Sequence, residues 1–318
     1  MKKILIYLII AVITFSSGCS INRPLKNNFE GKSSKIQVYA SFYPLYFAVQ
    51  EIGRDKVDLY SVIPNGVEPH DYEPTIRETA RIENADLFIY NGADMEPWGD
   101  KLAKTLRTKN IAIINASEQV DLLRIDEDEH HDSLHRDEEN HVHGNYDPHL
   151  WLNPLNMDKI GYVIKEQLSS VDNVNKDFYE NNYKDFSNKL RELDNKYTKE
   201  LKNKKRDTIL VSHEAFNYLS SRYEFKQISV SGVTPHEEPT PKTLANLIDL
   251  AVGKDFKYIF LEVLASPKTA EMLAKEADLK VLVLNPIAGL TEEQQKKGEN
   301  YFTLMEQNLE NIKKELVQ

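Results

Sequence analysis

The chain has 318 residues, of which 41% are hydrophobic and 28% charged, a balance typical of a globular protein of about two domains. Its formal net charge is −10, and residues 126–139, with eight acids and one arginine, contribute −7 of that charge. The remaining surface is nearly neutral, which argues against nucleic acid as a partner and favours a cationic ligand near the acidic stretch.

The N-terminus has the pattern of an export signal. Lys2 and Lys3 precede an apolar run of about twelve residues, which is too short to span a bilayer. The run closes on Ser-Ser-Gly-Cys, a junction that resembles the lipobox of bacterial lipoproteins, although Ser16 stands where leucine is usual. We expect residues 1–18 to be a signal peptide and residues 19–35 a tether. Cys19 would carry a lipid that anchors the protein to the extracytoplasmic side of the cell membrane, the alternative being a free structural cysteine.

From Ile36 onward, short β-rich runs alternate with helical stretches, which predicts a parallel α/β fold. A further helix is predicted after Asn153 and Pro154, a helix cap followed by a first-turn residue. We expect residues 36–172 to form a first lobe, with strands at 36–42, 57–63, 86–91 and 111–115 and helices at 74–84 and 97–107.

Residues 126–146 differ from the rest of this lobe. Histidines alternate with carboxylates there, and no periodic apolar face is present, which predicts a mobile loop. Metal bound to such a loop must also order the chain, so we expect the loop to concentrate metal weakly. Its histidines are His130, His131, His135, His141 and His143.

A long helix is predicted over residues 177–204, which contain neither proline nor glycine. Apolar residues recur there with a spacing of three or four and form one stripe, and the helix would be roughly 40 Å long. A coiled coil would need longer heptad repetition. We therefore expect residues 173–205 to be a rigid connecting helix.

The alternation of strands and helices restarts after this helix, so residues 206–318 are predicted to form a second lobe. The predicted fold is two α/β lobes, each with a four-stranded, mainly parallel sheet, joined by one long rigid helix with a metal site in the cleft. The strands are expected at 208–212, 227–230, 258–263 and 280–284, and the helices at 214–223, 241–252 and 267–277.

Three histidines, His70, His149 and His213, each follow a predicted strand, His149 by way of the long loop. Ligands of parallel sheets gather at the carboxyl ends of strands. Each alone is also explained as a surface-turn or core histidine. Together, three neutral imidazoles predict a zinc site, whereas harder metals such as manganese would want more carboxylate. Asn217 stands where a zinc-protease HExxH motif would need its second histidine, so an enzyme of that class is not indicated.

From Ile36 to its C-terminus the chain contains the motifs NGVEPHDYEPT, NGADMEPW, DPHLW, SHEAF and FLEVLASPKTAEMLA. With these motifs it resembles the zinc ABC-transporter solute-binding lipoproteins, the ZnuA-like and AdcA-like proteins. The resemblance implies a non-enzymatic, monomeric protein that captures zinc outside the membrane and hands it to a membrane permease. It implies that His70, His149 and His213 are ligands, and that His213 marks the zinc branch, since manganese relatives carry glutamate there.

Two residues depart from the family pattern. Ala288 stands where relatives carry a carboxylate as a fourth ligand, which leaves water, Glu68 or a loop histidine for that position, in that order. His236 matches no family ligand. Two alternative functions remain open from the sequence, a lipid-anchored surface adhesin with the same fold, or a manganese- or iron-binding member of the family.

Overall fold

The computed structural model describes residues 35–125, 146–232, 240–263 and 267–318. Cys19, the predicted loop histidines and His236 lie outside the described residues. Among the helices of the described part of the chain, none is both long and apolar enough to cross a membrane.

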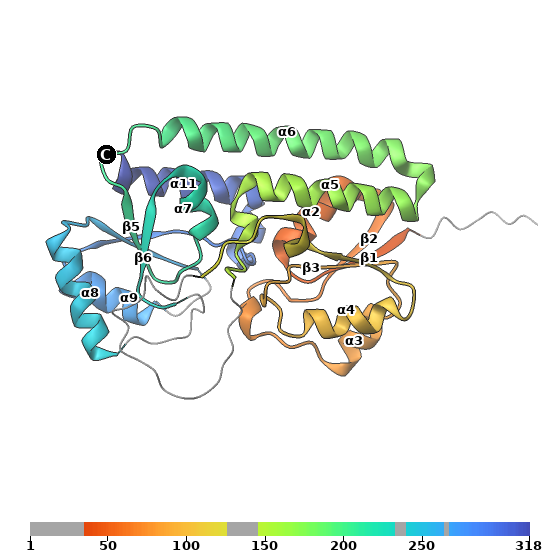
Figure 1. The fold of residues 1–318 in the computed structure, drawn as a ribbon, viewed down its shortest axis with the longest axis horizontal. Helices are drawn as coiled ribbons and strands as arrows, with labels where there is room; N and C mark the ends of the chain where they lie inside the picture. The colour runs from red at the N-terminus through yellow and green to blue at the C-terminus, as the bar shows by residue number, and fades with distance from the viewer. Residues whose placement is uncertain (1–34, 126–145, 233–239, 264–266) are drawn as a thin grey trace, which may run out of the picture. The chain divides into compact units, whose positions relative to one another are not determined.

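The first sheet is four-stranded and entirely parallel, in the order β2-β1-β3-β4 (Figure 1). All four predicted strands are present, each ending within about two residues of its predicted end. Helix α3 begins after Thr75, whose side chain forms a capping box with Glu78. The elements are β1 (Ile36–Ala40), α2 (Tyr43–Gly53), β2 (Val57–Ser61), α3 (Ile76–Ile82), β3 (Leu87–Tyr90), α4 (Gly99–Arg107) and β4 (Ala112–Asn115).

The second sheet repeats this topology, with four parallel strands in the order β6-β5-β7-β8. The predicted two-sheet α/β architecture is therefore confirmed. The helix predicted from residue 214 starts only at Asn217, because the chain bends at residues 212–214 and is irregular at residues 215–216. The elements are β5 (Thr208–Val211), α7 (Asn217–Tyr223), β6 (Lys226–Ser229), α8 (Pro241–Gly253), β7 (Tyr258–Leu261), α9 (Lys268–Glu276) and β8 (Lys280–Val283).

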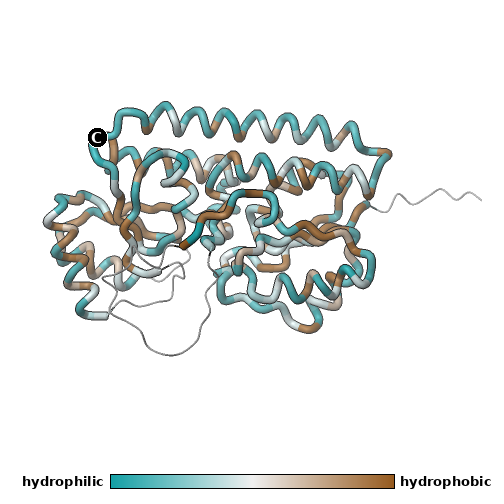
Figure 2. Tube along the Cα trace, in the orientation of Figure 1, coloured by the Kyte–Doolittle hydropathy of each residue, from teal (hydrophilic) through white to brown (hydrophobic). Residues whose placement is uncertain are grey.

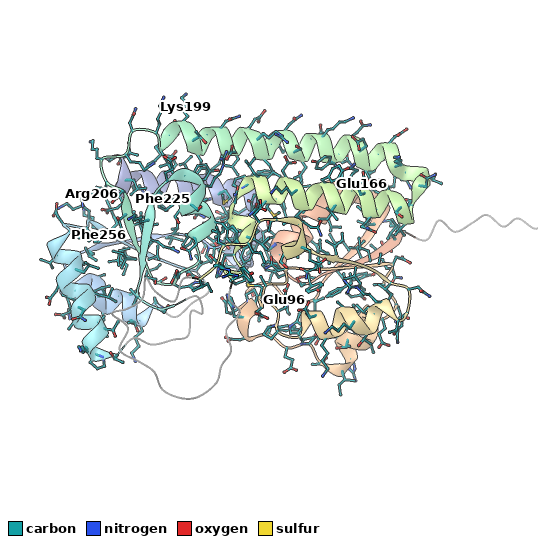
Figure 3. The ribbon with its side chains drawn as sticks, viewed as in Figure 1. Glu96, Glu166, Lys199, Arg206, Phe225 and Phe256 are labelled. Atoms are coloured by element: carbon teal, nitrogen blue, oxygen red, sulfur yellow. The ribbon has the colours of Figure 1, made fainter. Side chains whose placement is uncertain are left out.

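The predicted long helix is α6, Lys176–Glu200, which packs against α2, α5 (Pro154–Val171) and the C-terminal helix α11 (Tyr301–Leu316) (Figure 1). Its apolar stripe is buried, while Lys199 points outward from the helix (Figure 3). Helix α11 and the short α10 (Glu292–Lys297) follow β8, and neither helix was predicted from the sequence.

Helix α11 also joins the two halves of the chain, so α6 is not the only element that spans both. The ring of Tyr301 stacks on Phe47 of α2 at 5.9 Å between centroids, and Phe302 packs against Phe47 and Phe186 of α6. One hydrophobic cluster consequently runs from the first sheet through α6 and α11 into the second sheet. In Figure 2 the strongly apolar stretches lie mainly on the strands, and the outer surface of α6 is hydrophilic.

Candidate metal centre

His70 lies in a short 3-10 turn, Pro69–Asp71, eight residues beyond the carboxyl end of β2. Pro69 fixes the start of the turn, and the Glu68 carboxylate accepts a weak hydrogen bond from the His70 amide at 3.5 Å. Trp98 donates its indole N–H to the carbonyl of Tyr72, 2.9 Å away, and so holds the end of the same turn. The His70 side chain is half-buried.

His149 is 1% exposed and lies at the start of a 3-10 turn, Leu150–Leu152, that leads into α5. The Asn153 side chain caps α5 by accepting from the Leu155 amide at 3.0 Å, as the sequence predicted. Asp147 orients the ring, since its Oδ1 lies 2.8 Å from both the backbone nitrogen and Nδ1 of His149. Because Nδ1 donates to this carboxylate, Nε2 carries the lone pair that faces the cluster.

His213 is 2% exposed and follows β5 by two residues. Its Nδ1 is hydrogen-bonded to the carboxylate of Glu262, which directly follows the neighbouring strand β7. Adjacent parallel strands end at the same edge of a sheet, which explains why residues 49 positions apart in sequence meet there. The second histidine of the cluster thus has the same support as His149, a buried carboxylate on Nδ1.

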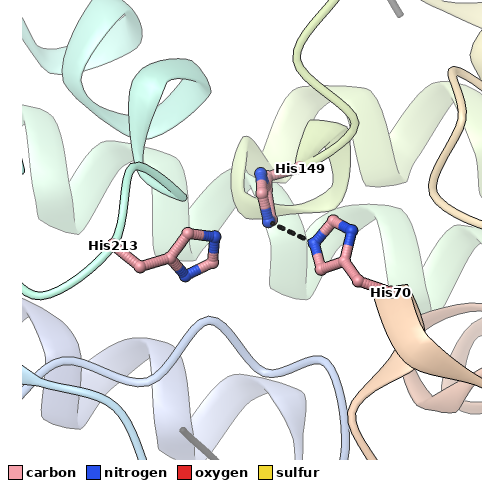
Figure 4. Close-up of side chains that lie close together, drawn as sticks. All are labelled: His70, His149 and His213. Carbon is pink, nitrogen blue, oxygen red and sulfur yellow. Dashed lines mark hydrogen bonds between the residues drawn. The ribbon is translucent and has the colours of Figure 1, made fainter. Parts of the chain in front are cut away.

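The three rings converge on one point (Figure 4). One ligand nitrogen from each ring can be chosen so that all lie within 4.8 Å of one another. The Nε2 atoms of His70 and His149 are 3.4 Å apart. A tetrahedral zinc ion with ordinary Zn–N bonds requires ligand nitrogens about 3.3 Å apart, so this pair already has the required spacing and His213 needs only a small approach.

Burial determines the charge of this centre. Desolvation lowers the pKa of His149 well below its usual value of 6.5, so the ring is neutral and its lone pair is available at neutral pH. Desolvation raises the pKa of Asp147 to about 7, and burial together with the charge of Glu262 raises that of Glu68 to about 7. One carboxylate oxygen each of Asp147 and Glu262 is buried without a hydrogen-bond partner among the described residues. A cation in the cluster would compensate this buried negative charge.

The NGADMEPW motif supports the cluster without entering it. The Asn91 side chain donates to the carbonyl of Pro148 at 2.8 Å, directly before His149. Asn91 is held in turn by Glu96, a buried residue (Figure 3) whose carboxylate accepts from the Asn91 amide at 2.9 Å and from the Ser41 hydroxyl. Gly92 has φ +73°, and a Cβ there would lie 2.2 Å from the side-chain oxygen of Asn115, so only glycine fits.

Sequence reasoning brought forward the three histidines but missed Asp147 and Glu262 as their partners. Asp147 had a detectable signal, because an acid two residues before a buried histidine can reach its ring. Glu262 had a weaker signal, its position at the end of a strand predicted for the same sheet as β5. Ala288, the residue at the family's carboxylate position, is buried, with 6% of it exposed, and it follows Ile287, whose φ is +59°. Its methyl group offers no ligand atom.

Comparison with known proteins relates the chain to metal-uptake proteins. The family model described as zinc-uptake complex component A, periplasmic, matches residues 38–315. The high-affinity zinc uptake system protein ZnuA of Bacillus subtilis is 37% identical over 312 residues, which cover 98% of this chain and 97% of that protein. The zinc-binding lipoprotein AdcA of Streptococcus pneumoniae is 37% identical over 98% of this chain, which spans 61% of that longer protein.

Solved structures show the same likeness. The Zn(II)-bound ZnuA-like domain of Streptococcus pneumoniae AdcA is 35% identical with a TM-score of 0.76, covering 89% of this chain and 100% of that domain. The laminin-binding protein of Streptococcus agalactiae, described as bifunctional with adhesin and metal-transporting activity, is 28% identical with a TM-score of 0.74. That match covers 88% of this chain and 99% of the other.

Proposed function

We propose, because the chain belongs to the family of zinc-uptake complex component A proteins, that it captures zinc outside the membrane and delivers it to an ABC-transporter permease. The family is one of uptake components and not of enzymes. His70, His149 and His213 are the proposed ligands. The observation that carries this assignment is the convergence of three ligand nitrogens within 4.8 Å, two of the rings being oriented by buried carboxylates.

The choice of zinc rests on ligand chemistry as well as on the relatives. Three imidazole nitrogens suit the four-coordinate geometry of zinc, whereas manganese favours oxygen ligands and a larger coordination number. Residues 36–172, 173–205 and 206–318 would serve as first lobe, connecting helix and second lobe. The cluster takes His70 and His149 from the first and His213 from the second, as a cleft site requires.

A monomer held at the extracytoplasmic face of the cell membrane by a lipid on Cys19 is the form we propose for the protein in the cell. The relative AdcA is named a lipoprotein, which is consistent with a lipid anchor in that protein. In this chain the proposal rests on the export pattern of residues 1–18.

A metal competition tests this function. We expect the protein, equilibrated with equal excess of zinc, manganese, cobalt and iron and then desalted, to retain one tightly bound zinc ion by elemental analysis. A matched variant lacking residues 126–145 should keep that ion, because none of the three proposed ligands is removed. Recovery of stoichiometric manganese, or loss of the tight ion in the shortened variant, would contradict the proposal.

The fourth ligand position permits a second prediction. Because Ala288 offers no ligand atom, we propose water as the fourth donor ahead of Glu68. Glu68→Gln should then change zinc affinity by less than about tenfold, on the order of 1.4 kcal/mol, in a chelator competition. Ala288→Glu should tighten binding by supplying a carboxylate. A hundredfold loss in Glu68→Gln that Ala288→Glu restores would instead identify Glu68 as the ligand.

An adhesin role is the second candidate, favoured by the likeness to the bifunctional laminin-binding protein of Streptococcus agalactiae. Saturable binding of the purified protein to immobilised laminin, unchanged in the presence of a chelator, would establish the second role. Absence of such binding would leave zinc capture as the single function.

A further inference from the structure

The backbone of the segment Asp147–Leu152, which carries His149, is held by side chains from four other elements or loops. Four of its carbonyl oxygens accept a side-chain hydrogen bond. The donors are Tyr218 to Asp147 at 3.0 Å, Asn91 to Pro148 at 2.8 Å, Asn156 to Leu150 at 3.0 Å and Tyr301 to Trp151 at 2.7 Å. Two donors come from the first half of the chain and two from the half that follows α6.

Tyr218 has a special place among these donors. Its side chain is 3% exposed in α7, and its hydroxyl also accepts a hydrogen bond from the Leu123 amide at 3.1 Å. Leu123 and Asp147 are themselves paired, since the Asp147 amide donates to the Leu123 carbonyl at 2.9 Å. The Tyr218 hydroxyl, which belongs to the second lobe, therefore holds both of the paired backbone segments, the one at Leu123 and the one at Asp147.

Asp147 passes this constraint on to the metal centre. The carbonyl of Asp147 is held by Tyr218, and its carboxylate holds both the amide and the ring of His149. Tyr218 also lies only five residues after His213, in the first turn of α7. The segment that carries His213 and the backbone that carries Asp147 are therefore both tied to α7.

We infer that Tyr218 is a positioning residue that couples the second lobe to His149. Through this coupling, His149 and His213 would enter or lose the zinc-binding geometry together. The inference rests on the proposed function, because it concerns how firmly that site holds zinc. It assigns Tyr218 no direct contact with the metal. A protein that must hold an ion tightly and then release it on docking gains from such coupling, because one displacement weakens two ligands.

The test compares Tyr218→Phe with Tyr197→Phe. Tyr197 is the matched control, because it is also a buried tyrosine whose hydroxyl donates to a backbone carbonyl, that of Met305 at 2.6 Å, and it belongs to α6. Both variants keep the ring and lose the hydroxyl's bond to a backbone carbonyl, so both should lower the urea midpoint of the metal-free protein. Tyr218→Phe should lower it somewhat more, because it also removes the acceptor of the Leu123 amide. Only Tyr218→Phe should weaken zinc binding and release zinc faster to a chelator. We expect a change in affinity of up to about tenfold, the lower end of the effect of removing a ligand's own hydrogen-bond partner, because Tyr218 acts on His149 through Asp147.

A second measurement distinguishes positioning from stability. The visible absorption of the cobalt(II)-loaded protein reports coordination geometry, and we expect it to change in Tyr218→Phe and to match the wild type in Tyr197→Phe. Equal zinc release and identical cobalt spectra in the two variants would overturn the role of Tyr218. A wild-type protein that retains no zinc would refute the proposed function itself, so the two failures are distinguishable.

Discussion

His70→Ala is expected to lower zinc affinity by more than about a hundredfold, because loss of even an outer-shell partner of a zinc ligand costs 10- to 100-fold. The variant would leave two imidazoles, which cannot complete a stable zinc site. His70 is half-buried, in contrast to His149 and His213, so its truncation creates little cavity. The free energy of unfolding of the metal-free variant should therefore stay within about 0.5 kcal/mol of the wild type.

Thermal unfolding without zinc reports the stability of the metal-free protein. The shift on adding zinc reports zinc affinity, since stabilisation by a ligand depends on its affinity for the folded state. The wild type should gain several degrees on zinc addition, and His70→Ala should gain almost none. His70→Glu provides the matched variant, because its carboxylate is also a zinc ligand and should restore part of the gain. An undiminished zinc-induced shift in His70→Ala would show that His70 is not a ligand.

The site histidines were found in the sequence because His70 and His213 follow strands, and His149 follows one by way of the long loop. His70 comes after β2 and His213 after β5, and the rule places each of them at the ligand-binding edge of its own sheet. The support of the rings was not found, because it depends on which side chains face each other across the molecule. The bond between Tyr218 and the Asp147 carbonyl joins residues 71 positions apart and follows no local pattern.

In the fold, too, some elements could be predicted from local sequence and others could not. Strand alternation and the apolar stripe of α6 predicted both sheets and the long helix, since these are properties of local sequence. Helix α2 was not predicted, because it is buried on most sides and its apolar residues show no single face. Helix α11 had a usable signal, a capping Asn300 followed by apolar residues at a spacing of three or four.

The packing of α11 across both halves leads to the largest expected effect on stability. Tyr301 is fully buried, stacks on Phe47 of α2 and donates its hydroxyl to the Trp151 carbonyl at 2.7 Å. Tyr301→Ala should therefore lower the free energy of unfolding by about 3–5 kcal/mol, the usual cost of removing a large buried aromatic ring. Urea denaturation of the metal-free protein measures this change.

Tyr301→Phe separates the ring from its hydroxyl, and it should cost only about 1 kcal/mol, the net value of one buried hydrogen bond. The cluster that contains Tyr301 continues from the first sheet into the second, so the wild type should unfold in one cooperative transition. Tyr301→Ala, which weakens that connection, should either shift this single transition to lower urea or split it into two transitions, one for each lobe. A cost below about 1 kcal/mol for Tyr301→Ala would mean that the packing of α11 does not join the lobes energetically.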